Sequence, residues 1–236
     1  MGIAGQPSGS TDVAEVFSTY LYDGNGSTKT ITNGIDLAGE GGMVWLKCRG
    51  ATGDHSIFDT ESGAVGGYRL RPNSTAALQN FDGGNVFTTS ATGFALNNTA
   101  GNDFNDGGNG GYVSWTFRKK EKFFDIVTYS GNSTSGRTLS HSLGSVPAMM
   151  IIKQTNGTNA WFVYHKDFIK DSAAAPNSAL FLNLADAGDS NAGYFNNTAP
   201  TDSVFTLGNS SGDWGTNGSG ENYVAYLFAD NSSEDA

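Results

Sequence analysis

Cysteine and basic residues are scarce in this chain of 236 residues. The only cysteine, Cys48, leaves no partner for an internal disulfide and excludes a zinc site built from several cysteines. Only 13 Lys and Arg stand against 23 Asp and Glu, which gives a formal net charge of −10. Because this charge would repel a phosphate backbone, we expect no nucleic-acid partner.

Long hydrophobic runs are missing as well. No uninterrupted apolar stretch approaches the roughly 18 residues of a membrane span, so we expect no membrane insertion. The first residues, MGIAGQPSGST, lack both a basic segment and an apolar segment, so we expect no secretory signal. Glycine, in contrast, is abundant at 33 residues and accompanies Asn, Ser and Thr rather than the five prolines. This composition is typical of a chain with many turns.

An internal repeat runs through most of the chain. Three pairs of segments match in the same order: 94–117 with 205–228 at an offset of 111 without a gap, 16–25 with 123–132 at an offset of 107, and 43–47 with 149–153 at an offset of 106. The second pair ends in a shared Y-x-G-N turn, and the third pair ends in lysine. We therefore predict an N-terminal arm (1–13), a first repeat (14–118), a second repeat (119–230) and an acidic C-terminal tail (231–236).

The apolar residues of these segments alternate, as expected of strands. Val113, Trp115 and Phe117 fall on one face of a strand, and its counterpart repeats this choice with Val224, Tyr226 and Phe228. We predict that this face, which carries the larger side chains, is the core face. The best helix candidate, 166–175, is only one to two turns long and is followed by Pro176. The pattern predicts an all-β fold of two tandem, duplicated β-sandwich units, jelly-roll-like, with short loops and almost no helix; it leaves open whether the sandwiches are separate or merged.

Patterns typical of catalysis are weak in this sequence. The three histidines stand in unrelated contexts, and no Ser or Cys lies in a G-x-S-x-G setting, so we expect no enzyme and no cofactor. The string NDFNDG makes Asp103 and Asp106 candidate calcium ligands, because carboxylate and amide oxygens suit Ca²⁺. The EF-hand spacing fails, however, because Ser114 stands where a bidentate Glu is required. An Asx-turn is the alternative.

Two other features suggest contacts with a ligand or a partner. Phe104 and Trp214 lie in corresponding Gly/Asn loops, where they are candidates either for stacking on a sugar or a neighbouring subunit or for plugging the core beneath the loop. The basic run RKKEK at 118–122 marks the joint between the repeats. It is either a solvated turn or a contact with an acidic neighbour.

Several strings resemble the repeat modules of virion structural proteins of marine bacteriophages, cyanophage-like proteins of tail-fibre or capsid-surface type. They are IDLAGEGGMVWLK (35–47), SHSLGSVP (140–147), WFVYHK (161–166), NTAPTDSVFTLG (197–208) and YVAYLFA (223–229). The resemblance covers nearly all of residues 14–230. It implies a non-enzymatic virion component with a β-sandwich fold, and it supplies no catalytic residues.

The resemblance leaves two functions open. The first is a structural protein on the surface of the phage particle, either a capsid decoration or cement protein or a short tail appendage. The alternative is a carbohydrate-binding adhesin for host attachment, such as a tail fibre or receptor-binding protein. Expected partners are other capsid or tail proteins, further copies of the chain in a homo-oligomer with a trimer favoured, and a host surface glycan. We expect the protein to be made in the host cytoplasm and to reside on the virion.

Overall fold

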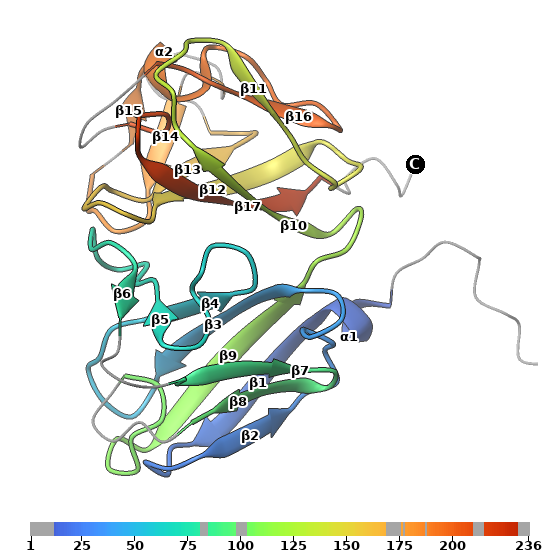
Figure 1. The fold of residues 1–236 in the computed structure, drawn as a ribbon, viewed down its shortest axis with the longest axis vertical. Helices are drawn as coiled ribbons and strands as arrows, with labels where there is room; N and C mark the ends of the chain where they lie inside the picture. Colours follow the sequence, from blue (N-terminus) through green and yellow to red (C-terminus); the bar gives the residue numbers. More distant parts are fainter. Residues whose placement is uncertain are drawn as a thin grey trace, which may run out of the picture.

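The computed structural model describes residues 12–80, 85–97, 103–168, 176, 178–186, 188–209 and 215–230, and it is built almost entirely of β-strands (Figure 1). Within these residues the helices are single turns, α1 (Val13–Val16) and α2 (Ala192–Phe195). The all-β prediction is therefore confirmed. Residues 1–11 of the arm, the tail and most of the helix candidate at 166–175 lie outside the described residues.

The first half, blue to green in Figure 1, contains two main antiparallel sheets. One has the order β1 (Phe17–Asp23), β9 (Gly111–Arg118), β3 (Gly42–Cys48), β4 (Ser56–Asp59). The other has the order β2 (Lys29–Thr32), β8 (Gly93–Leu96), β7 (Phe87–Ser90). A short hairpin, β5 (Tyr68–Arg69) with β6 (Gln79–Asn80), extends toward the second half.

The second half repeats the order of the first four strands and adds to it. Its large sheet runs β10 (Phe124–Ser130), β17 (Asn222–Ala229), β12 (Pro147–Gln154), β13 (Phe162–His165), β14 (Ser178–Phe181), β15 (Asp189–Ser190). A small sheet pairs β11 (Arg137–Ser140) with β16 (Val204–Leu207). In each half the strand that opens the unit is thus an edge strand paired with the strand that closes it.

The Y-x-G-N turns have the same structural role in both halves. The hydroxyl of Tyr22 donates to the carbonyl of Phe104 at 2.6 Å, and that of Tyr129 donates to the carbonyl of Thr216 at 2.7 Å. Both tyrosines therefore fasten the end of an edge strand to the Gly/Asn loop of their own half. The glycine of the turn is required by this close approach, because a Cβ at Gly24 would lie 2.2 Å from the carbonyl oxygen of Asp106.

Buried side chains form three clusters rather than two. One lies between the sheets of the first half, and it includes Tyr22, Val44, Phe58, Phe94 and Tyr112. A second lies inside the second half, and it includes Tyr129, Ile152, Phe162, Tyr223 and Leu227. The third contains residues of both halves: Met43, Ile57, Ala64 and Leu70 with Phe124, Ile126, Ile151, Trp161, Val163, Val224 and Tyr226. The halves therefore share a buried contact of their own.

The predicted core face was right only in part, because Val224 and Tyr226 are fully buried but do not face the interior of their own half. In β17 the alternate residues Tyr223, Ala225 and Leu227 fill the interior of their own half, whereas Val224 and Tyr226 belong to the cluster between the halves. The physical reason is that both faces of the strand are covered, one by its own small sheet and one by the other half. Burial alone does not say which partner covers which face.

Candidate functional site at the seam between the halves

The seam, as we call the surface where the two halves meet, is formed by the outer faces of the two large sheets. Phe117 of β9 lies at the centre of an aromatic group, with its ring centroid 5.6 Å from those of Phe124 and Phe228. The third buried cluster continues this contact along β12 and β13. Because this contact is apolar and closely packed, it fixes one half against the other.

Polar groups are also buried in the seam. Lys153 of β12 is fully buried, and its amino group donates to the carbonyls of Thr75 at 2.9 Å, Asn159 at 2.8 Å and Gly157 at 3.2 Å. Thr75 belongs to the first half, so the lysine ties the halves together. Burial lowers the pKa of Lys153 to about 8, because desolvation disfavours the charged form.

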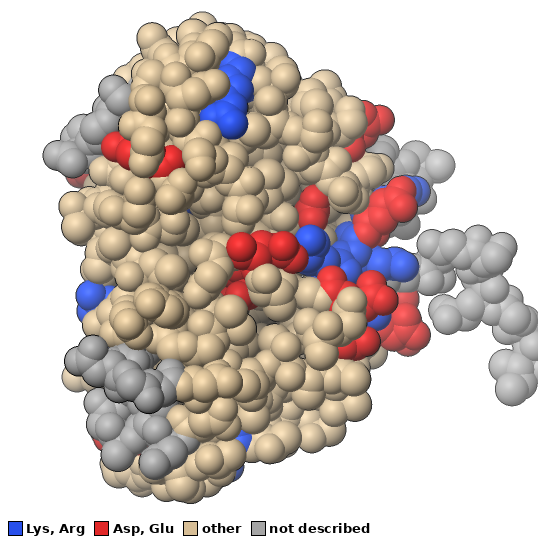
Figure 2. Space-filling model, viewed as in Figure 1, with Lys and Arg blue, Asp and Glu red and all other residues tan. Residues whose placement is uncertain are grey.

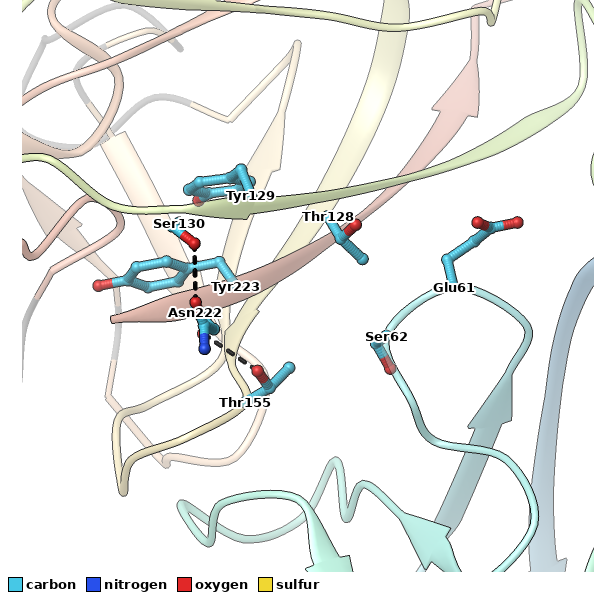
Figure 3. A pocket seen from close by; sticks show the side chains of 8 residues that line it. All are labelled: Glu61, Ser62, Thr128, Tyr129, Ser130, Thr155, Asn222 and Tyr223. Carbon is cyan, nitrogen blue, oxygen red and sulfur yellow. Dashed lines mark hydrogen bonds between the residues drawn. The ribbon is translucent and has the colours of Figure 1, made fainter. Parts of the chain in front are cut away.

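A polar hollow of about 360 Å³ opens where the apolar contact ends (Figure 3). It is lined by Glu61, Ser62, Thr128, Tyr129, Ser130, Thr155, Asn222 and Tyr223, and we call it the seam hollow. The wall from the second half carries hydroxyl and amide groups, with Ser130 Oγ donating to Asn222 Oδ1 at 2.8 Å. The opposite wall is the loop after β4, which supplies a carboxylate and a hydroxyl. The lining offers both donors and acceptors to a hydroxyl-rich ligand.

The two aromatic rings behind the seam hollow do not present a stacking surface. Tyr129 is 8% exposed and Tyr223 is 2% exposed, and their rings stack on each other with centroids 5.0 Å apart. Desolvation and then the Glu221 hydrogen bond raise the pKa of Tyr223 above its ordinary range, so this ring stays neutral. Recognition in the hollow would therefore rest on hydrogen bonds.

Charged side chains gather beside the seam, where Figure 2 shows Lys and Arg surrounded by Asp and Glu. Lys119 Nζ lies 3.0 Å from Glu61 Oε1 and 3.8 Å from Asp125 Oδ1. Lys119 belongs to the basic run at 118–122, so one positive charge of this run is paired within the chain. This pairing also holds Glu61 at the rim of the hollow.

The predicted site residues that the structure describes do not line the seam hollow. Phe104 is fully buried, with its ring edge-on to Phe58 at 5.3 Å, so the prediction of a ligand-stacking ring was wrong and the core alternative holds. Hydrophobic burial explains this, because the ring fills the core of the first half. Trp214 lies outside the described residues.

The two aspartates proposed as calcium ligands are engaged by protein groups. Asp103 forms a salt bridge of 2.9 Å with Arg69. Asp106 accepts from the backbone N–H of Gly108 at 2.7 Å and from the side chain of Asn109 at 3.2 Å, which is the Asx-turn alternative. No group of three or more His, Cys, Asp or Glu able to hold a metal ion occurs in the part of the chain that the structure describes.

The residues that form the seam were not recognised as a site from the sequence. Lys153 did leave a signal, because both repeats place a lysine at the end of an apolar strand. The hydroxyl and amide residues of the hollow left none, since Ser, Thr and Asn occur throughout this chain.

Comparison with known proteins identifies a family. A family model described as a domain of unknown function (DUF7483) matches residues 12–233, and the chain belongs to that family. No curated protein and no solved structure matches the chain. Across the described residues, no helix is long and apolar enough to cross a membrane.

Proposed function

We propose that this member of the DUF7483 family is a non-enzymatic structural protein of a phage virion, exposed on the particle surface as a capsid decoration or cement protein or as a short tail appendage. The resemblance of its repeat strings to virion modules supports the proposal. The observation that carries it is the seam, because apolar packing and buried polar bonds fuse two β-units into one stiff block. Such a block suits a protein that bears mechanical load and presents its loops outward.

We infer that the halves are duplicated β-sandwich units of jelly-roll type. The shared strand order β1-β9-β3-β4 and β10-β17-β12-β13 supports a duplication. So do the stacked tyrosine pairs, Tyr22 with Tyr112 at 5.3 Å and Tyr129 with Tyr223 at 5.0 Å, which occur at corresponding positions.

The test is to follow the protein into particles. Phage particles from the biological source of the sequence are separated on a density gradient. Each fraction is then probed with an antibody raised against the purified chain. A decoration protein is expected in the particle fraction at tens to hundreds of copies, and an appendage at a few. Finding the protein only among unassembled soluble proteins would overturn the proposal.

A second candidate function is carbohydrate binding, and the seam hollow favours it. The hydrogen-bonding wall is specific to the second half, because Thr128, Asn222 and Thr155 correspond to Leu21, Gly111 and Arg49 in the first. The repeat itself therefore does not require these polar groups. Hydroxyl and amide groups that converge on an open hollow suit a neutral, hydroxyl-rich ligand.

A pair of matched variants tests this second function. Thr128→Val removes one hydroxyl from the hollow while keeping the shape of the side chain, and Thr30→Val does the same at an exposed position on β2. If glycans bind in the hollow, signals on a glycan array are lost in Thr128→Val and kept in Thr30→Val. The absence of any glycan signal, or an equal loss in both variants, rejects the hollow as a sugar site.

A further inference from the structure

The two halves present corresponding edge strands that differ in one respect. β1 is the edge of the first large sheet and β10 is the edge of the second, and each pairs with the closing strand of its half. An edge strand carries backbone N–H and C=O groups that point away from the sheet and can pair with another strand. An edge is open to another strand where these outward groups have no hydrogen-bond partner within the chain.

The β10 edge is occupied by its own chain at Phe124 and at Ile126. Phe124 N–H donates to the carbonyl of Lys120 at 3.0 Å, and Lys120 N–H donates to the carbonyl of Phe124 at 2.9 Å. Farther along, Ile126 N–H donates to Oδ1 of Asp125 at 2.9 Å, while Oδ2 of Asp125 accepts from Ser142 N–H at 2.7 Å. A carboxylate thus occupies the outward donor and attaches a neighbouring loop beside it.

The β1 edge begins in the same way and then remains open. Phe17 N–H donates to the carbonyl of Val13, so the odd-numbered residues of β1 direct their backbone groups away from β9. Ser18 stands where β10 has Asp125, so no carboxylate reaches the next outward donor. Among the described residues, none hydrogen-bonds to the outward backbone groups of Thr19 and Leu21.

Exposed apolar side chains gather along this open edge. Leu21 is 58% exposed, Val13 is 63% exposed and Tyr20 is 37% exposed. Residues 17–22 carry no charge, no proline and no lysine, the features by which natural proteins prevent edges from pairing. An open edge whose one charge, Asp23, lies at its end and whose other exposed side chains are largely apolar is suited to pair with another strand.

We propose that β1 pairs antiparallel with β1 of a second copy of this chain, across a two-fold axis near Tyr20. In this register Thr19 lies opposite Leu21 of the second copy, so the outward groups of each strand meet and bond. The four-stranded sheets of the two copies then join into one sheet. The Leu21 side chain of each copy is covered by the other copy. A second copy fits because the strand is its own complement: no like charges face each other although each chain carries a net charge of −10.

The inference concerns only contact between copies, so it stands apart from the virion proposal. It favours a dimer built from a two-fold contact rather than the trimer expected from the sequence, because a two-fold strand pair closes on itself.

The experiment compares association of the full chain with that of two matched variants. Leu21→Lys places a charge on the open edge, and Thr138→Lys places the same charge at an exposed strand position of the second half, on β11. Sedimentation velocity is measured over a range of protein concentrations, with thermal unfolding to confirm that both variants fold. We expect a dimer for the wild type and for Thr138→Lys, and at least about tenfold weaker association for Leu21→Lys. Hydrogen exchange at the amides of Thr19 and Leu21 is expected to slow as the dimer forms.

Each other outcome overturns the proposal. A wild type that remains monomeric at all concentrations, or a dimer or trimer that Leu21→Lys leaves intact, rules out pairing through β1. A chain shortened to begin at residue 12 tests a different occupant of the edge. If the full chain is monomeric and the shortened chain dimerises through β1, the N-terminal segment, and not a second copy, occupies the edge of the full protein.

Discussion

The hydroxyl of Tyr226 donates a hydrogen bond of 2.6 Å to Oδ2 of Asp59, and the two residues belong to opposite halves of the chain. Both are essentially inaccessible to solvent. Asp59 also accepts from the backbone N–H groups of Glu61 and Ser62, which form one wall of the seam hollow. A single buried carboxylate therefore connects the packing of the halves to the shape of the candidate site.

Replacing Tyr226 with Phe tests this connection. The variant removes one of the hydrogen-bond donors to the buried carboxylate of Asp59. We therefore expect a loss of about 1–3 kcal/mol in the free energy of unfolding. Denaturant unfolding measures it. Tyr20→Phe, at a half-exposed ring on β1, is the control and should change stability by less than about 0.5 kcal/mol. Equal effects in both variants would show that the bond between the halves is not a stabilising contact.

Truncation of Phe104 separates a core role from a ligand-binding role. Phe104→Ala removes a fully buried ring from the first core, so we expect a loss of about 3–5 kcal/mol. Trp115→Ala should cost less, because this indole is only partly buried. Denaturant midpoints compare the two. A Phe104→Ala protein as stable as the wild type would contradict the core assignment.

The strands were predictable because their alternation is a local property of the chain. The repeat located β9 and β17 as corresponding strands, and both close their units. Which partner covers each face of β17 was not predictable, because Tyr223 and Tyr226 have the same side chain but belong to different clusters. That assignment depends on how the two halves pack, which no local pattern records.

The seam hollow was not predictable for a related reason. Glu61 and Asn222 line the same hollow although 161 positions separate them along the chain. Neither stands in a motif, and the residue types are common here. Phe104 and Trp214, in contrast, carry a local signal, because large aromatic residues are unusual in Gly/Asn loops. In the case of Phe104 this signal marks core packing.

Removal of the Asn217 side chain should destabilise the Y-x-G-N turn of the second half. Its Nδ2 donates to the carbonyls of Thr134 at 3.0 Å and Gly208 at 2.9 Å, and its Oδ1 accepts from Asn132 N–H at 3.1 Å. Because Asn217 is fully buried, Asn217→Ala leaves these groups without their partner, and we expect a loss of about 1–3 kcal/mol. Asn80→Ala, at an exposed position, serves as the control in the same thermal unfolding series. Similar melting temperatures for the two variants would argue against this role of Asn217.

Lys153 should make stability depend on pH in the alkaline range. Burial lowers its pKa from 10.5 to about 8 in the folded protein. Between about pH 8 and pH 10 the folded state has released this proton and the unfolded state still holds it. Because the unfolded state then binds more protons, stability rises with pH, by at most about 1.4 kcal/mol per pH unit for one group. Tyrosines with raised pKa values, such as Tyr194, oppose this rise only above their ordinary value of 10.

The Lys153→Met variant isolates this contribution, because methionine has a similar length and no titrating group. Denaturant unfolding from pH 7.5 to 9.5 should show stability rising in the wild type and a smaller slope in Lys153→Met. Lys47→Met changes the corresponding lysine of the first half, which is partly exposed and donates to the carbonyl of Gly53 at 2.7 Å, and should keep the wild-type slope. If Lys153→Met keeps the full slope, the amino group stays protonated across this range, and its three carbonyl acceptors outweigh the cost of burying its charge.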